Sequence, residues 1–313
     1  MTSEPALRSS PTARRATAFP LENRSWPREA WLIARAYATL AKPGIIWLLL
    51  VTTVPAMVMA EQGWPGLDLV ALVLLGGVLT SGGANALNQW FDRDIDALMH
   101  RTRNRPIPQG RVTPRHALLF GSTLAAVGGV QLALTVNLLS AGLALGAVAF
   151  YVLVYTIWLK RWTPQNIVIG GAAGSIPPLV GWAAVRNDLD LTPLLLFLII
   201  FLWTPPHFWA LALRYKDDYA RAQVPMLPVI SGEATTKRQI LLYALLLTAA
   251  SVLLFPLSGA GWLYLGVALA LGAGFVGMAG FLWRGRVQPM SVFFASIAYL
   301  PVLFIVAGVD AAL

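Results

Sequence analysis

Three polar residues recur at every fourth position where a long apolar stretch ends. Asn88, Asp92 and Asp96 would share one face of a helix, because residues four positions apart are neighbours there. Like charges at this spacing repel, so the arrangement becomes favourable once a divalent cation lies between the carboxylates. Mg²⁺ prefers oxygen ligands and is held by one or two carboxylates together with substrate phosphates. The spacing predicts a catalytic magnesium site formed by these three residues, with Asp92 and Asp96 as metal ligands.

A run of arginines follows the acidic stripe. Arg101, Arg103 and Arg105 come shortly after Asp96, and a forked guanidinium group binds phosphate oxygens through parallel hydrogen bonds. A metal site with arginines beside it predicts a diphosphate substrate. The alternative is a solvated loop at the membrane surface that binds no ligand. The continuity of the stripe with the apolar stretch favours the diphosphate site.

A second acidic pair ends another apolar stretch further along the chain. Asp217 and Asp218 follow Lys216, and alone such a pair is typical of a solvated loop. Together with the first cluster it predicts a second half of the same site, facing the first across a helical bundle. We expect Asp217 and Asp218 to be catalytic, Asp218 to bind metal and Lys216 to contact the diphosphate.

Four more ionisable residues border or interrupt apolar stretches. Lys42 precedes one stretch, and Lys160 and Arg161 follow another, so we expect all three to contact the diphosphate. His207 lies within an apolar stretch. An ionisable residue inside a membrane is a functional candidate, although such a histidine is often a packed, hydrogen-bonded core residue.

The composition of the whole chain predicts that most of its surface faces lipid. The 313 residues are 57% hydrophobic and 12% charged, with a mean hydropathy of +0.66. An ordinary soluble domain has about 25% charged residues, so most of this surface must face lipid. This excludes a water-soluble enzyme, a nucleic-acid-binding domain and a disordered chain. The absence of cysteine excludes disulfides, cysteine–zinc sites and thiolate nucleophiles.

Apolar stretches long enough to cross a lipid bilayer predict an all-α integral membrane protein, a bundle of nine transmembrane helices around a central cavity. The nine stretches are residues 44–60, 69–91, 115–134, 138–158, 165–184, 192–213, 238–258, 261–283 and 289–310. Residues 1–35, in which serine, threonine, proline and arginine are frequent, predict a disordered or surface-lying tail before an intramembrane domain over residues 36–313.

The basic residues predict the orientation of this bundle. With nine spans, every lysine and arginine except Arg186 falls on one face. Because loops on the cytoplasmic side are rich in Lys and Arg, this face is expected to be cytoplasmic, with the N-terminus inside and the C-terminus outside. The net charge of +9 therefore requires no nucleic-acid partner.

The stripe from Asn88 to Asp96 and the arginines after it resemble the first aspartate motif of the UbiA superfamily of intramembrane prenyltransferases. Within this superfamily, three stretches are most similar to the branch that farnesylates protohaem IX: residues 155–171, 174–182 and 203–211. The resemblance covers residues 38–310. One departure concerns the second motif, in which Arg214 stands where the superfamily usually has aspartate, and this predicts fewer metal ligands in the second cluster.

The resemblance implies a reaction. It implies transfer of a farnesyl group from farnesyl diphosphate to a vinyl group of haem B, with Mg²⁺ as the cofactor and addition of water, giving haem O. It further implies haem contacts from His207 and Tyr155, a bacterial inner membrane with the active site on its cytoplasmic face, and haem A synthase or a terminal oxidase as a downstream partner. Two alternatives are a quinone precursor or a chlorophyllide as acceptor, and a haem or ion transporter.

Overall fold

The computed structural model describes the backbone of residues 26–313 and the side chains of residues 29–313, except those of residues 45 and 47–49. Within this range the chain is helical and contains no strand. Its helices are α1 (Trp26–Ala41), α2 (Pro43–Glu61), α3 (Leu67–Phe91), α4 (Arg93–Leu98), α5 (Pro114–Thr135), α6 (Leu138–Ala149), the π-helix η1 (Phe150–Leu159), α7 (Lys160–Trp162), α8 (Asn166–Gly174), α9 (Pro177–Arg186), α10 (Leu191–Arg214), α11 (Lys216–Arg221), α12 (Leu227–Ile230), α13 (Gly232–Ser258), α14 (Trp262–Trp283) and α15 (Pro289–Ala312).

The predicted all-α membrane fold is confirmed. Eight of the predicted stretches coincide with helices, or with helices joined end to end, that are long and apolar enough to cross a membrane. Helix α6 continues through η1 and α7 as one span, and α8 continues into α9 as another. The first predicted stretch coincides with α2, in which the fully described apolar part, Leu50–Glu61, is shorter. The count of nine spans and the orientation of the termini therefore stay predictions.

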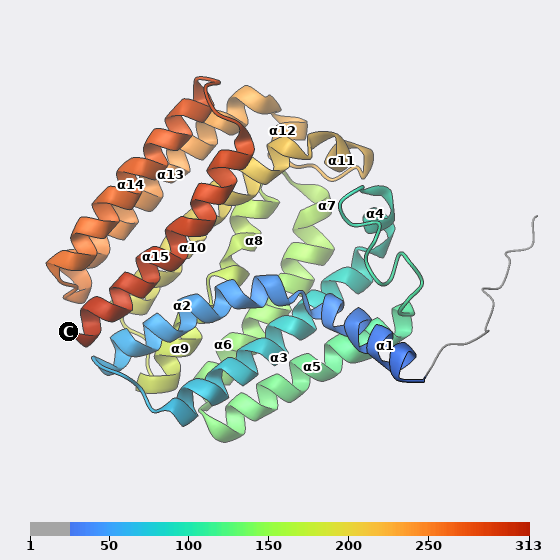
Figure 1. The fold of residues 1–313 in the computed structure, drawn as a ribbon, viewed down its shortest axis with the longest axis horizontal. Coiled ribbons are helices and arrows are strands. Elements are labelled where there is room, and N and C mark those ends of the chain that lie inside the picture. Colours follow the sequence, from blue (N-terminus) through green and yellow to red (C-terminus); the bar gives the residue numbers. More distant parts are fainter. Residues whose placement is uncertain (1–25) are drawn as a thin grey trace, which may run out of the picture.

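The helices form a bundle with two unlike ends (Figure 1). The short helices α4 and α11 and helix α1 lie at one end, and the C-terminus lies at the other. The mostly apolar sequence of the spans accounts for the lipid-facing surface, since many leucine, valine and isoleucine side chains stay exposed. The buried core is formed mainly by α10, α13, α14 and α15.

Helix α3, which carries the first acidic cluster, is held by close packing against α5. A Cβ atom on Gly83 would lie 2.6 Å from the backbone nitrogen of Ala125 and 2.6 Å from the carbonyl oxygen of Gly121. Only glycine permits this approach, and small residues at such contacts are typical of helices packed in membranes. The packing fixes α3 as a rigid support for the side chains at its end.

Helix α1 begins inside the segment predicted as a tail. Residues 1–25 lie outside the described residues, whereas residues 26–35 belong to this helix. Its Ala36 and Leu40 are buried against the bundle, while Trp31 is 57% exposed. An amphipathic helix of this kind lies along a surface.

Candidate active site

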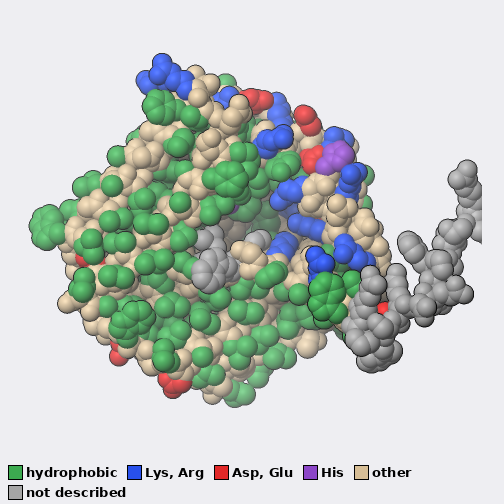
Figure 2. Space-filling view, in the orientation of Figure 1, with side chains coloured by type: hydrophobic (Ala, Val, Ile, Leu, Met, Phe, Trp, Pro, Cys, Tyr) green, Lys and Arg blue, Asp and Glu red, His purple; other side chains and the backbone are tan. Residues whose placement is uncertain are grey.

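The first acidic cluster is buried at the junction of α3 and α4. Asp92 is 0% exposed and Asp96 2% exposed. Helix α3 ends one residue before Asp92, whose carbonyl oxygen accepts the amide hydrogen of Asp96 at 2.8 Å. The helical register therefore continues across the junction, and Asn88 remains on the same face, as predicted. Figure 2 shows Lys and Arg side chains around a hollow at this end of the bundle.

Every carboxylate of the first cluster has a basic or amide partner from elsewhere in the chain. The ammonium group of Lys160 donates to Asp92 Oδ2, and the Asn88 amide donates to the same oxygen at 2.8 Å. Arg105 Nη1 contacts both oxygens of Asp96, at 2.8 and 2.7 Å. Buried carboxylates require such partners, because an unpaired buried charge is costly.

The π-helix η1 (Phe150–Leu159) leads directly into Lys160, whose side chain lies at the acidic cluster. A π-helix forms i→i+5 hydrogen bonds, so its turn is wider than that of an α-helix. Thr156 stabilises the wider turn, since its hydroxyl donates to the Tyr151 carbonyl oxygen at 2.8 Å. The same hydroxyl accepts from the Asn88 amide at 3.1 Å, so it ties η1 to the acidic cluster.

Asp94, the third aspartate of this segment, lies outside the buried cluster. Its two carboxylate oxygens each accept from Arg161 at 2.7 Å, and these hydrogen bonds lower the pKa of Asp94 to about 2. The Arg161 guanidinium also lies 3.9 Å from Asp92. Asp94 therefore holds Arg161 at the edge of the cluster.

The second acidic cluster divides into a buried and an exposed residue. Asp218 is 6% exposed and pairs with Arg221 one helical turn further along α11. Asp217 is exposed, and Lys216 pairs with Glu233 at 3.7 Å rather than with an acid of the cluster. Of these three predicted residues, the structure places only Asp218 in a buried position.

The two clusters are linked across the bundle. Arg101 follows the first cluster, and its guanidinium donates to the hydroxyl of Tyr219 in α11 at 3.3 Å. The same guanidinium lies 5.9 Å from the ring centre of Tyr215. Arg103 is exposed and contacts neither cluster through its side chain.

The carboxylates fit a cation that is shared with a ligand. Asp92 Oδ1 and Asp218 Oδ2 are buried, and neither accepts a hydrogen bond. Within the described part of the chain, no group of three acidic, histidine or cysteine residues could hold a metal alone. Mg²⁺ usually takes only one or two carboxylates and completes its shell with water and phosphate, so the unpartnered oxygens fit this ion. Asp96, whose oxygens are bound by Arg105, would have to exchange that partner to become a ligand.

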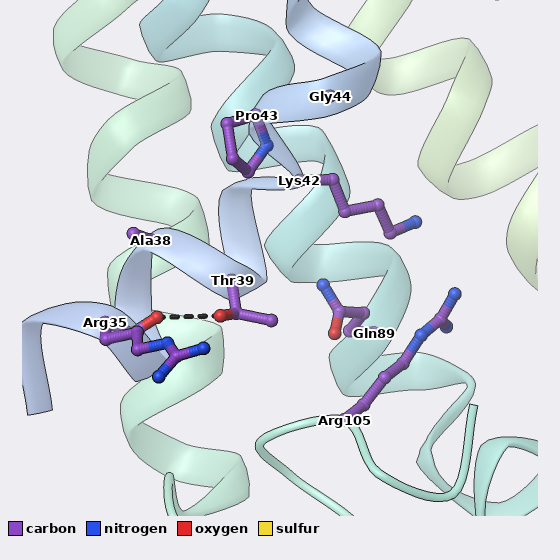
Figure 3. A pocket seen from close by; sticks show the side chains of 8 residues that line it. All are labelled: Arg35, Ala38, Thr39, Lys42, Pro43, Gly44, Gln89 and Arg105. Carbon is purple, nitrogen blue, oxygen red and sulfur yellow. Dashed lines mark hydrogen bonds between the residues drawn. The ribbon is translucent and has the colours of Figure 1, made fainter. Parts of the chain in front are cut away.

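A cleft of about 540 Å³ adjoins the first cluster on the side of α1. Eight residues line it: Arg35, Ala38, Thr39, Lys42, Pro43, Gly44, Gln89 and Arg105 (Figure 3). The Lys42 ammonium donates to Asn88 Oδ1 at 3.2 Å. Burial, together with the nearby cations Arg105 and Lys160, lowers the pKa of Lys42 to about 7. Lys42 is thus half-buried and forms no ion pair with a carboxylate in the part of the chain that the structure describes.

His207 and Tyr155 both lie in aromatic surroundings. The His207 ring stacks between Trp203, at 4.3 Å between ring centres, and Phe293, at 4.5 Å. Its Nδ1 atom lies 2.7 Å from the hydroxyl of Ser296, which leaves Nε2 as the ring nitrogen for a haem contact. Tyr155 stacks on Tyr151 at 5.4 Å.

Three residues of this site lay outside the sequence-based predictions: Arg35, Gln89 and Thr156. Thr156 lies in a stretch without a charged residue, and its role depends on a π-helix that the apolar pattern does not reveal. Gln89 adjoins Asn88 in sequence, but its side chain donates to the Leu40 carbonyl oxygen at 2.7 Å and so belongs to the cleft.

Comparisons with known proteins identify this architecture. The profile of the UbiA prenyltransferase family matches residues 49–306. The chain is 50% identical over 284 residues to a protoheme IX farnesyltransferase of Streptomyces avermitilis, covering 88% of this chain and 93% of the relative. It is 52% identical over 285 residues to the protein of the same name from Synechocystis, covering 89% of each.

Solved structures share the fold at low sequence identity. A digeranylgeranylglyceryl phosphate synthase superposes with a TM-score of 0.74 at 18% identity, over 90% of this chain and 99% of that chain. A UbiA homolog from Archaeoglobus fulgidus bound to DMAPP and Mg²⁺ superposes with a TM-score of 0.68 at 19% identity, over 88% of this chain and 98% of that chain.

Proposed function

The chain belongs to the UbiA prenyltransferase family, and from this premise we propose that it converts haem B to haem O. It transfers the farnesyl group of farnesyl diphosphate to a vinyl group of haem B, with addition of water. The relatives that share about half of their aligned residues with this chain carry the name protoheme IX farnesyltransferase. The observation in the structure that supports this function best is the buried Asp92, one oxygen of which accepts no hydrogen bond, with the basic side chains of Lys160 and Arg161 around it.

The acidic residues supply the ligands of the proposed metal site. Asp92 and Asp218 would hold Mg²⁺ through their unpartnered oxygens, and Asp96 would join them after release of Arg105. When bound with the diphosphate, the ion neutralises negative charge on the leaving group.

The basic residues bind and orient the diphosphate. Lys160 and Arg161 would donate to its oxygens from α7, while Arg101 would approach from the side of α11. As the carbon–oxygen bond breaks, its electron pair stays on the diphosphate, and these fixed cations stabilise the charge where it develops. We further propose Lys42 and Arg105 as diphosphate contacts on the side of the cleft, and Arg103 and Lys216 as outer contacts.

The acceptor supplies the nucleophile. The haem vinyl group forms a bond to C1 of the farnesyl group, and water adds to the resulting carbocation and loses a proton. No nucleophilic protein side chain is required, which agrees with a sequence that contains no cysteine. His207 and Tyr155 are proposed haem contacts, His207 through Nε2.

The chain is an integral membrane protein. Because its relatives are bacterial, we propose the inner membrane, with the acidic clusters on the cytoplasmic side. A product that remains in the membrane would pass to haem A synthase or to a terminal oxidase.

Mass analysis of the product tests the reaction. The purified protein is incubated with haem B, Mg²⁺ and farnesyl diphosphate, and the molecular mass of the extracted haem is measured by mass spectrometry. The proposal predicts a gain of one farnesyl group plus one water, dependent on Mg²⁺. Unchanged haem, together with prenylation of a quinone precursor or chlorophyllide offered in its place, would contradict it.

A further inference from the structure

The cleft beside α1 contains a cluster of positive charge without acidic residues. Its eight lining residues, all of them described, include Arg35, Lys42 and Arg105 but no aspartate or glutamate. Arg105 is paired with Asp96 outside the cleft, whereas the Lys42 ammonium donates to the neutral oxygen of Asn88 and forms no ion pair with a carboxylate among the described residues. A concave surface lined by one sign of charge attracts a ligand of the opposite sign. The cleft is therefore suited to an anion.

The positive charges stand at two places in the cleft. Figure 3 shows Lys42 and Arg105 reaching toward the same space on either side of Gln89, with Arg35 at the other end beside Thr39. Two separated positive ends are better matched by a ligand with two anionic groups than by a single phosphate.

The walls between the charges are small and apolar. Ala38, Pro43 and Gly44 line the cleft, and a Cβ atom on Gly44 would meet nothing within 4 Å. A hydrated diphosphate gains nothing from such walls, whereas the edge of a flat apolar ring is buried favourably against them. The chemistry thus fits an amphipathic dicarboxylate.

The cleft is held in shape by α3 and by a strained backbone. The Gln89 amide donates to the Leu40 carbonyl oxygen, and the Asn85 amide donates to that of Ala41 at 3.2 Å. Lys42 follows with φ of 53°, in the left-handed region that residues other than glycine rarely adopt. Gln89 is 1% exposed, and its Oε1 has no hydrogen-bond partner. This oxygen can only accept a hydrogen bond, as can a carboxylate of the ligand. A water molecule that donates to both would therefore lie between them.

We propose that this cleft binds the two propionate carboxylates of the haem acceptor, with Arg35 at the end remote from the acidic clusters and Lys42 at the near end. This inference rests on the proposed function and adds α1 to the acceptor site. Lys42 and Arg105 border both substrates, so Arg35 is the residue that distinguishes the acceptor from the diphosphate. Its exposed side chain stacks on Trp31 and contributes no buried contact on which folding would depend.

Haem binding by the full-length Arg35→Gln variant tests the assignment. The dissociation constant is measured by titrating absorbance without farnesyl diphosphate, using haem B and its dimethyl ester, in which both carboxylates are blocked. We expect a roughly tenfold weaker affinity for haem B, the scale of a lost charge-assisted hydrogen bond. The affinity for the ester should stay within about twofold of wild type. Arg115→Gln, which changes an exposed arginine of α5 outside the cleft, is the matched control and should leave both affinities unaltered.

Three results would overturn the proposal. The first is equal weakening for haem B and its ester, and the second is weakened binding of farnesyl thiodiphosphate with haem affinity unchanged. The third is an effect confined to vesicles containing anionic lipid and missing from phosphatidylcholine vesicles, since that would assign the cleft to lipid headgroups.

The same measurements separate this proposal from the proposed reaction. Wild-type protein that farnesylates haem while Arg35→Gln binds haem normally would refute the cleft assignment alone. Wild-type protein that makes no farnesylated haem, with the predicted Arg35 pattern intact, would refute the reaction alone.

Discussion

The two acidic clusters occupy the same end of the bundle but are built in different ways. In the first, Asp92 and Asp96 are partnered by Lys160 and Arg105, which lie 68 and 9 residues away along the chain. In the second, Asp218 pairs with Arg221 within one turn of the same short helix. The first cluster thus depends on tertiary packing, and the second on local structure.

This difference indicates unequal roles. Lys160, which α7 holds against Asp92, can stay in place as charge develops on a leaving group, which is the condition for electrostatic catalysis. A local pair such as that of Asp218 and Arg221 can open without disturbing the fold. We infer that Asp92 and Lys160 are preorganised, and that Asp96, after release of Arg105, and Asp218 complete the site when the diphosphate arrives.

The strongest test of the comparison removes the centre of the first cluster. Asp92→Asn should lower turnover about 100-fold or more, the scale for loss of one group that stabilises transition-state charge. The rate is expressed per amount of folded protein, because the amide keeps the size of the side chain but leaves the Lys160 ammonium without its carboxylate partner. Near-normal turnover at saturating Mg²⁺ would show that the diphosphate binds elsewhere.

The second cluster offers a matched pair of neighbours. Asp218→Asn should lower turnover about 10- to 100-fold and raise the Mg²⁺ concentration needed for half-maximal rate, because its free oxygen is a proposed metal ligand. Asp217→Asn, at an exposed position, should change the rate by no more than about threefold. Steady-state rates over a Mg²⁺ series measure both, and equal losses in the two variants would refute the division into buried and exposed roles.

A smaller effect should follow from loosening the first cluster without touching its charges. Thr156→Val keeps the side-chain shape but removes the hydroxyl that joins Asn88 to the Tyr151 carbonyl oxygen. We expect turnover to fall about five- to tenfold, consistent with the loss of one or two buried hydrogen bonds. Thr156→Ser restores the hydroxyl and should recover most of the rate. If serine is no better than valine, the methyl packing rather than the hydrogen bond is what matters.

Substitution of His207 is expected to have the smallest effect on binding of the prenyl diphosphate. His207→Ala should weaken haem retention and shift the Soret band of bound haem, while the affinity for farnesyl thiodiphosphate stays unaltered. The reason is that His207 packs among aromatic rings of α10 and α15 and contacts neither acidic cluster. A folded variant with an unchanged Soret band and haem affinity would make His207 a core residue held by Ser296, and its loss would then cost only about 1–3 kcal/mol of stability.

The sequence predicted the spans well because nearly every lipid-facing position is apolar, a signal that does not depend on tertiary contacts. It also predicted the face shared by Asn88, Asp92 and Asp96, since helical periodicity alone decides it. It could not reveal that Lys160 pairs with Asp92, because the two residues lie 68 positions apart in the sequence and meet only through the packing of the helices. Nor could it separate Asp217 from Asp218, whose burial depends on how α11 packs.

Equally, Arg35 and Gln89 became visible only through contact between α1 and α3. A basic residue outside the apolar stretches is indistinguishable in sequence from one that sets membrane orientation. Placing it beside Lys42 required the turn between α1 and α2, which the apolar pattern leaves undefined.

We infer that the two unequal clusters share one diphosphate and its metal, and a binding measurement tests this directly. Binding of farnesyl thiodiphosphate, which resists cleavage, is measured calorimetrically with and without Mg²⁺ for the wild type and for Asp92→Asn, Asp218→Asn and Asp217→Asn. We predict Mg²⁺-dependent binding by the wild type and Asp217→Asn, and loss of the Mg²⁺-dependent part in each of the other two variants. Wild-type affinity with unchanged Mg²⁺ dependence in Asp218→Asn would contradict the claim and confine the metal to the first cluster.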